Sequence, residues 1–232
     1  NPPTLTAETH FRVNSLGLQA LLDALKEQPQ TRVVSIGSAA VYGSGRRLTE
    51  SSPLEPSNIY GASKAAGTIV GCAYAKVYGI GFVELRLFSA FGPWERARRL
   101  IPYSILCALA GTAIRLSDGA QQRDFLYVDD VVDALISAAR TSLPPGTVLN
   151  VCSGVGRPVE EIVDTVLEVM GKSVPILKGE RTTRSDEIWE MSGDSSAAEA
   201  VLGWTPKTDF REGLRKTAEW FESNRDIVED LA

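Results

Sequence analysis

Residues 32–38 read RVVSIGS, a short β-branched run that ends in Gly and Ser. Such a run is typical of a strand buried within a parallel sheet. Upstream, from Thr9 to about Lys26, leucines recur at helical spacing and predict an amphipathic helix. Downstream, residues 60–78 predict a long helix and residues 82–88, FVELRLF, predict a second strand. This order of helix, strand, helix and strand predicts an α/β fold.

The same alternation continues to the end of the chain. Further helices are predicted near 100–110, 129–140, 158–170, 196–202 and 210–224, and further strands over 113–116, 124–128, 148–153 and 174–177. Asp209, with Glu212 three residues later, is similar to a capping box at the start of the last helix. Residues 43–58, rich in Gly, Ser and Pro, predict a loop. The pattern favours a Rossmann-like, doubly wound parallel sheet with helices on both faces.

The composition is that of an ordinary globular protein. The apolar share is 44% and the charged share 23%, which disfavours disorder. Lys and Arg total 24 against 29 for Asp and Glu, so the formal charge of −5 gives no electrostatic footprint for nucleic acid. The longest apolar runs are too short to span a bilayer. We therefore expect neither a nucleic-acid nor a membrane partner.

The cysteines and the histidine bear on metal binding and on the cellular compartment. Cys72, Cys107 and Cys152 lie far apart with no pairing pattern, and His10 is the only histidine. A zinc site cannot be assembled from these residues, so we expect no metal. The unpaired cysteines favour a reducing compartment, and we expect a cytoplasmic protein.

The stretch YGASK carries the strongest local signal for chemistry. Tyr60 and Lys64 are four residues apart and therefore lie on one face of the predicted helix. A neighbouring ammonium lowers the pKa of a phenol and makes it a usable proton acceptor and donor. Ser38 ends a predicted strand, where ligands bind in parallel sheets, so it could meet Tyr60 at one substrate hydroxyl. The alternatives are a chance spacing and a serine that satisfies only backbone groups.

Several further motifs accompany these residues. In chain order they are GSAAVYG (37–43), the region of Glu50 and Pro53, NIYGASK (58–64), RLFSAFGP (86–93), QQRDFLYVDDV (121–131), VLNVCSG (148–154) and LGWTPKTDFREGLRKT (202–217). Together they cover nearly the whole chain in the order found in the extended short-chain dehydrogenase/reductase family, which contains the nucleotide-sugar epimerases and dehydratases. The chain is identified as a member of that family by this resemblance.

The resemblance implies a catalytic triad of Ser38, Tyr60 and Lys64. Tyr60 would exchange a proton with a sugar hydroxyl while a hydride passes between that carbon and the nicotinamide of NAD or NADP. Lys64 would hold the nicotinamide ribose and lower the pKa of Tyr60, and Ser38 would bind the reacting oxygen. Asn14 resembles the family's asparagine in the helix beneath the cofactor, although an ordinary polar helix position explains it equally well.

The resemblance also implies a nucleotide diphosphate sugar as the substrate. Arg123 resembles the arginine that clamps the diphosphate, a role suited to a bidentate guanidinium. Arg184 and Asp186 lie where the family often has a second such pair, and Arg181 is an equal candidate. Ser89 stands where the family usually has Asn, which would replace an amide contact to the phosphates by a shorter hydroxyl contact.

A second departure concerns the type of reaction. Dehydratases of the family follow the catalytic Ser or Thr with an Asp and Glu pair, whereas this chain has Ala39 and Ala40. Neither alanine can act as acid or base. The sequence therefore favours an epimerase that acts through a transient keto-sugar, with a nucleotide-linked 4-keto-6-deoxy-sugar reductase as the alternative.

A third departure concerns the cofactor site, because the family's G-x-G-x-x-G loop does not occur in these 232 residues. From the motif order we expect the chain to begin within the nucleotide-binding domain. We expect residues 1–94 and 123–152 to belong to that domain, and residues 95–122 and 153–232 to form mainly the substrate-binding region. A non-catalytic or partner-completed remnant of such an enzyme is the alternative from another functional class.

The helix from Tyr60 to Tyr78 has two interpretations. It contains many small residues, which allow close approach of another element: Ala65, Ala66, Gly67, Gly71 and Ala73. The family often pairs helices at this place, so the resemblance implies a homodimer through this helix. Packing of the same residues against the sheet explains them nearly as well.

Overall fold

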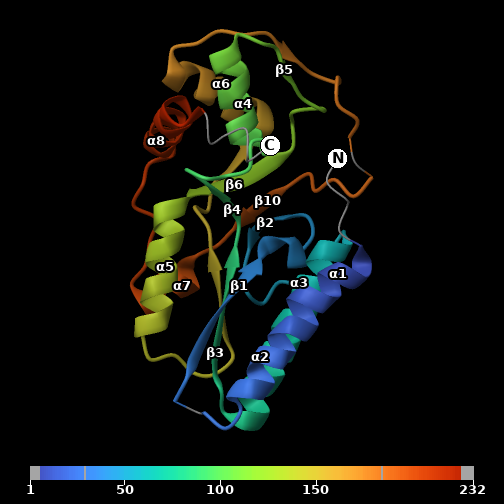
Figure 1. Ribbon diagram of the computed structural model, residues 1–232, viewed down its shortest axis with the longest axis vertical. Helices are drawn as coiled ribbons and strands as arrows, with labels where there is room; N and C mark the ends of the chain where they lie inside the picture. Colours follow the sequence, from blue (N-terminus) through green and yellow to red (C-terminus); the bar gives the residue numbers. More distant parts are fainter. Residues whose placement is uncertain (1–5, 29, 184, 226–232) are drawn as a thin grey trace.

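The computed structural model describes residues 6–28, 30–183 and 185–225 (Figure 1). A parallel sheet of three strands in the order β1, β3, β7 lies at its centre. Their bounds are Arg32–Ser38 for β1, Gly81–Leu87 for β3 and Thr147–Val151 for β7. The middle strand, β3, is buried over all but its end residues, which fits its nearly continuous apolar sequence. The strands predicted over residues 32–38, 82–88 and 148–153 are confirmed, and the structure adds their order in the sheet.

Helices cover both faces of the sheet (Figure 1). One face carries a continuous helical segment made of α1 (Ala7–Phe11), a π-helical turn (Arg12–Leu16) and α2 (Gly17–Leu25), followed by α3 (Ile59–Tyr78). The other face carries α5 (Val128–Arg140) and α7 (Ser196–Leu202). Alternate residues of β3 point to opposite faces of the sheet. Phe82 packs with Leu22 and Ala75 on one face, whereas Val83 and Leu85 belong to the cluster on the other face that includes Ala134.

Three further helices surround a second core at the other end of the molecule. They are α4 (Leu100–Ala110), α6 (Val159–Met170) and α8 (Phe210–Ser223), and they bury Ile101, Ile105, Ile162, Leu214 and Phe221. Here β4 (Ser89–Phe91) pairs in parallel with β6 (Gln122–Tyr127), β8 (Gly156–Pro158) runs antiparallel to β6, and β5 (Ile114–Arg115) pairs with β9 (Ile176–Leu177). The helices predicted in this part of the chain are confirmed, while the domain boundaries stay a prediction.

The ends of these helices follow the local sequence. Pro158 immediately precedes α6, and Gly171 ends it in the left-handed conformation, with φ 59°. At α8 the Asp209 carboxylate accepts hydrogen bonds from the backbone N–H groups of Arg211 and Glu212, as the predicted cap requires. The Glu212 carboxylate pairs with Arg215. Asp209 is thus confirmed as the N-cap of α8.

The prediction of a loop over residues 43–58 is wrong for its first part. Gly45–Leu48 forms β2, which pairs in parallel with β10 (Met191–Gly193). The sequence of β2 is GRRL, whose arginines are exposed, so neither hydrophobicity nor alternation indicates a strand. Its structure depends on a pairing partner far along the chain, which a local pattern cannot reveal.

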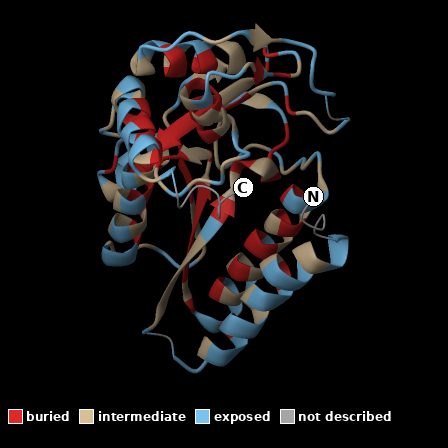
Figure 2. Cartoon of the chain, turned by 45° about the horizontal axis from the view of Figure 1, so that its top comes forward, coloured by how far each residue is buried: buried red, intermediate tan, exposed pale blue. Residues whose placement is uncertain are grey.

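Buried residues gather in the sheet and on the inner faces of the helices around it (Figure 2). Outward-facing helical residues are exposed, as the amphipathic patterns require. None of the helices in the described ranges is both long and apolar enough to cross a membrane.

Candidate active site

Ser38 is the last residue of β1, at the carboxyl end of the central sheet. Its hydroxyl oxygen accepts a hydrogen bond from the backbone N–H of Ala40 at 3.2 Å and caps a short 3-10 helix, Ala39–Val41. Ser38 therefore does bind a backbone N–H group, as the alternative interpretation of this serine expected. Because the oxygen acts there as an acceptor, the hydroxyl hydrogen remains for a substrate oxygen.

Tyr60 lies in the first turn of α3, directly beside this 3-10 helix. Asn58 is the N-cap of this helix, and its side-chain oxygen accepts a hydrogen bond from the backbone N–H of Gly61 at 2.9 Å. A Cβ at Gly61 would lie only 2.3 Å from the carbonyl oxygen of Ala40, so glycine is required for this approach. The backbone thus brings Tyr60 next to the turn that follows Ser38, with 40% of its surface exposed.

Lys64 completes the group from the next turn of α3. Its Nζ donates a hydrogen bond to the carbonyl oxygen of Ile36 at 2.9 Å and lies 6.0 Å from the centre of the Tyr60 ring. Burial lowers the pKa of Lys64, and the negative charge of Glu84 opposes that change. The three predicted triad residues are therefore gathered at the carboxyl end of β1.

Asn14 lies on the π-helical turn that packs against α3. Its Nδ2 donates to the hydroxyl oxygen of Ser63 at 2.9 Å, and that hydroxyl donates to the carbonyl oxygen of Tyr60 at 2.8 Å. Ser15 donates to the carbonyl oxygen of Ser63 at 3.0 Å. Asn14 therefore supports the turn that carries Tyr60, while its contact with a cofactor stays a prediction.

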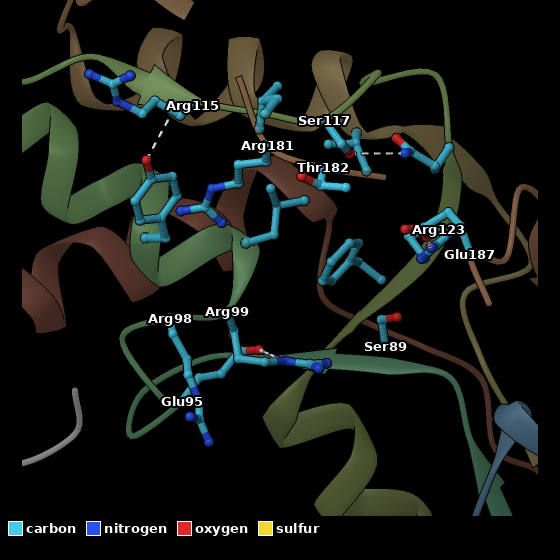
Figure 3. Close-up of a pocket in the computed structure, with 16 residues that line it drawn as sticks. Ser89, Glu95, Arg98, Arg99, Arg115, Ser117, Arg123, Arg181, Thr182 and Glu187 are labelled. Carbon is cyan, nitrogen blue, oxygen red and sulfur yellow. Dashed lines mark hydrogen bonds and ion pairs between the residues drawn. The ribbon is translucent and has the colours of Figure 1, made fainter. Parts of the chain in front are cut away.

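A cavity of about 360 Å³ lies beyond the carboxyl end of the sheet (Figure 3). The residues that line it are Ser89, Glu95, Arg98, Arg99, Leu100, Tyr103, Arg115, Leu116, Ser117, Gln121, Arg123, Phe125, Val159, Arg181, Thr182 and Glu187. Ser89 comes two residues after Leu87, which pairs with Ser38 across the sheet. The arginine-lined cavity therefore begins close to the strand ends that carry the triad.

Arg123, the predicted diphosphate clamp, lines this cavity and is held firmly. Its Nη1 donates to the carbonyl oxygens of Gln122 and Ile188, and its Nη2 donates to a carboxylate oxygen of Glu187. Only 18% of the side chain is exposed. An arginine fixed in this way presents its charge to the cavity with little freedom left to lose on binding.

The other predicted substrate residues have different outcomes. Ser89 and Arg181 both line the cavity, and the Arg181 guanidinium lies 4.2 Å from the centre of the Tyr103 ring. Asp186 does not line the cavity, whereas its neighbour Glu187 does. Arg184 lies outside the described residues. Their contacts with a substrate stay predictions.

Glu95 and Arg99 form a charged pair at the edge of the cavity (Figure 3). Arg99 Nε donates to Oε1 of Glu95 at 3.3 Å, and the buried Oε2 has no hydrogen-bond partner among the residues that the structure describes. Burial raises the pKa of Glu95 to about 7, although the Arg99 charge opposes the rise. This carboxyl therefore changes charge near neutral pH.

The sequence interpretation missed most of the cationic lining. Arg98, Arg99 and Arg115 were not singled out, nor was Glu187 as the partner of Arg123. A signal exists in residues 94–99, WERARR, where four charged side chains precede an apolar helix. The convergence of Arg115 with that segment depends on the fold and has no local signature.

The two residues after Ser38 provide no acid or base. Ala39 is buried and Ala40 is half-buried, and both lie in the 3-10 helix beside Tyr60. Their methyl groups place apolar atoms at the two positions where the resemblance implies carboxylates for a dehydratase. The arrangement can therefore exchange a proton through Tyr60 and bind a polyanion through arginines.

Comparison with known proteins places this chain in a family. The family model described as "NAD dependent epimerase/dehydratase family" matches residues 4–152. The chain is 32% identical over 233 residues to dTDP-glucose 4,6-dehydratase of Streptomyces griseus, covering 98% of this chain and 70% of that protein. It is 29% identical to UDP-glucuronate 4-epimerase 3 of Arabidopsis thaliana, covering 92% of this chain and 54% of that one.

Solved structures agree with this assignment. The dTDP-glucose 4,6-dehydratase from Bacillus anthracis in complex with NAD has a TM-score of 0.89 at 26% identity, over 99% of this chain and 74% of that one. MoeE5 in complex with UDP-glucuronic acid and NAD has a TM-score of 0.84 at 31% identity, over 90% and 71%. The predicted Rossmann-like α/β fold and the predicted family are both confirmed. The chain belongs to the NAD-dependent epimerase/dehydratase family of nucleotide-sugar enzymes.

Proposed function

We propose that the protein is an NAD(P)-dependent epimerase of a nucleotide diphosphate sugar, acting through a transient keto-sugar. The observation that carries the proposal is the gathering of Ser38, Tyr60 and Lys64 at the end of β1, next to an arginine-lined cavity and with no acid at the two positions after Ser38. The triad supplies proton exchange at one hydroxyl. The cavity supplies charge that suits a diphosphate.

The residues present fit the nicotinamide end of NAD. Tyr60 is partly exposed at the carboxyl end of a parallel strand, and Lys64 lies beside it, which is where dinucleotides bind in such sheets. Structures similar to this chain contain NAD. We favour NAD on this ground, with NADP as the alternative.

Each triad residue has a separate task at the reacting hydroxyl. NAD bound beside Tyr60 and Lys64 would supply the acceptor, and then the donor, for the hydride at the reacting sugar carbon. Tyr60, as the phenolate, takes the hydroxyl proton as the carbonyl forms, and its phenol gives a proton back to the oxygen in the second half. Ser38 donates a hydrogen bond to that oxygen, and the Lys64 ammonium stabilises the phenolate.

The cavity holds the part of the substrate that does not react. Epimerisation requires the keto-sugar to present its other face, so the nucleotide must stay bound while the sugar turns. Arg123 is braced for this purpose by Glu187 and by backbone carbonyls. Arg99 and Arg181 add positive charge from other segments of the lining. A nucleoside diphosphate, linked to a hexose, has the charge and size that this site requires.

Elimination of water needs an acid and a base beyond Tyr60. Several relatives carry the name dTDP-glucose 4,6-dehydratase, whereas another carries the name UDP-glucuronate 4-epimerase. The residues of this chain favour the second reaction, because Ala39 and Ala40 cannot transfer protons. The product of the proposed reaction has the mass of its substrate.

A product analysis tests the proposal. The full-length protein is incubated with UDP-linked and dTDP-linked hexoses without an added reductant, and products are analysed by mass spectrometry and NMR. We expect an epimer of unchanged mass and many turnovers per enzyme molecule. A product lighter by one water would assign a dehydratase, and turnover only with added NAD(P)H and a keto-sugar would assign the reductase. Absence of any turnover would favour the non-catalytic alternative.

We also propose that the protein forms a homodimer through α3. Of the small residues on this helix, Ala65, Gly67 and Gly71 are buried within the chain, so packing explains them. The apolar side chains of Ile69 and Val77 are more than 60% exposed and support a contact with a second copy. Sedimentation at micromolar concentration should show a dimer, and a monomer would remove this proposal.

A further inference from the structure

We propose that Glu84 is a positioning residue for Lys64, bracing the strand end and the helix turn that hold its ammonium beside the triad. The inference rests on the role proposed for Lys64 in the function above. Glu84 lies on β3, is only 2% exposed and pairs in register with Ser35 of β1. Neither the triad nor the arginine-lined cavity includes it.

The position of the Glu84 carboxyl is set by Gly37, the residue before Ser38. A Cβ at Gly37 would lie 2.9 Å from Cγ, Cδ and Oε1 of Glu84. The carboxyl therefore occupies the space that a side chain at position 37 would take. It lies against the strand between Ile36, whose carbonyl accepts from Lys64, and Ser38.

Thr68 ties the same carboxyl to the helix that carries Lys64. It stands one turn after Lys64 on α3, and its hydroxyl donates to Oε1 of Glu84 at 2.6 Å. The same hydroxyl lies 3.2 Å from the carbonyl oxygen of Lys64. Glu84 is thus connected to the strand end and to the helix turn that together place the lysine.

The charges around Glu84 support this role. The titratable and charged groups that face it are Lys64 and Cys72 from α3 and Arg86 from its own strand. Burial raises the pKa of Glu84, and the Thr68 hydrogen bond and the charges of Arg86 and Lys64 oppose the rise. Burial lowers the pKa of Lys64, and Glu84 opposes that fall. Each charge therefore stabilises the other in a buried environment.

A purely structural role would pair Glu84 with Arg86 alone. In that pair Arg86 Nε lies 3.4 Å from Oε1 and makes no hydrogen bond within the residues that the structure describes. Arg86 directs its Nη1 to the hydroxyl of Tyr42 at 2.7 Å and lies over that ring. The short hydrogen bond of Glu84 goes instead to Thr68, on the helix of Lys64.

The test measures the titration of Lys64 directly, without substrate or turnover. The full-length protein is treated with an amine-acylating reagent over a range of pH, and the modification rate of Lys64 is read by peptide mass spectrometry, with the exposed Lys172 as internal reference. In Glu84→Gln, loss of the negative charge should raise the rate at Lys64 about threefold or more at fixed pH, because more of the amine is neutral.

Two further variants separate positioning from folding. Thr68→Val is close in shape and removes the hydrogen bond that stabilises the Glu84 carboxylate, so it should raise the Lys64 rate in the same direction but less. Asp124→Asn is the matched control, since Asp124 is a fully buried carboxyl bonded to Ser153, Gly154 and Gly193, and it should leave the Lys64 rate unchanged.

The outcomes also distinguish this inference from the proposed function. If Glu84→Gln and Thr68→Val both leave the Lys64 rate as in the unaltered protein, the inference is overturned even if activity falls. If Glu84→Gln does not fold, the modification rate of Lys64 in Thr68→Val tests the inference in its place. If the Lys64 rate responds as expected but no nucleotide sugar is turned over, Glu84 still positions Lys64 and the proposed function fails separately.

Discussion

Ser38, Tyr60 and Lys64 are placed by two neighbouring elements through short backbone contacts, whereas the arginine-lined cavity takes its side chains from segments spread over residues 89–187. In the triad, one glycine and one lysine hydrogen bond fix the geometry. In the cavity, long side chains meet only after the whole chain has folded. The reaction therefore depends on a few local contacts, and recognition depends on many distant ones. Substitutions in the two regions should have separable effects.

The largest effect is expected from Tyr60→Phe, which tests whether the triad determines the turnover rate without affecting the affinity for the nucleotide. Removing the phenol oxygen eliminates proton exchange, so turnover should fall by roughly 10²- to 10⁴-fold. The affinity for a nucleoside diphosphate, measured by calorimetry, should stay the same because the cavity is untouched. Unchanged turnover would remove Tyr60 from the mechanism.

The converse substitution is Arg123→Ala, which should weaken the binding of the nucleotide far more than it lowers the rate at saturating substrate. A charge-assisted hydrogen bond is worth about 1.5–3 kcal/mol, so the dissociation constant for a nucleoside diphosphate should rise roughly 10- to 100-fold. The rate at saturating substrate should change little. Arg211→Ala is the matched control, because Arg211 pairs with Glu168 on the exposed surface and should have no effect.

Gly61→Ala should disturb the triad through the backbone. The added methyl would meet the carbonyl oxygen of Ala40 at 2.3 Å, which forces α3 away from the turn after Ser38. We expect a loss of about 1–3 kcal/mol in the free energy of unfolding, with a lower turnover rate. Chemical denaturation and steady-state kinetics measure the two quantities.

The control for that change is Gly17→Ala in α2. Its φ is −63°, and a Cβ there would make an ordinary contact of 3.4 Å with the carbonyl oxygen of Arg12. Alanine should be neutral or stabilise the protein by about 0.5–1 kcal/mol. Equal stability loss in both variants would show that the contact of Gly61 has no special importance.

The smallest expected effect is the pH dependence of nucleotide-sugar binding in the cavity. Since the pKa of Glu95 is raised to about 7, this carboxyl is mostly neutral at pH 6 and mostly ionised at pH 8. Ionised Glu95 pairs with Arg99 and repels a diphosphate, so affinity for a nucleotide diphosphate sugar should fall about threefold between these values. Glu95→Gln should give a flat profile. A profile of Glu95→Gln identical to that of the unaltered protein would contradict the assignment.

The same contrast explains what could be predicted from the sequence. The spacing in YGASK placed Tyr60 and Lys64 on one helix face, and Ser38 ends a strand at the same edge of the sheet, but it was the family resemblance that implied the triad. Ser89 and Arg123 were identified by resemblance and do line the cavity. Arg115 and Glu187 could not be found, because their positions depend on the packing of distant segments. For the same reason the pairing of β2 with β10 had no local signal.

The most direct test of the central claim follows a labelled hydrogen. A nucleotide sugar that the protein epimerises is prepared with deuterium on the carbon that bears the reacting hydroxyl, and the product is examined by NMR and mass spectrometry. If the hydride leaves and returns within one bound substrate, the epimer retains the deuterium on that carbon and its mass is unchanged. Loss of the deuterium to solvent, or a product lighter by one water, would contradict the proposed role of the triad.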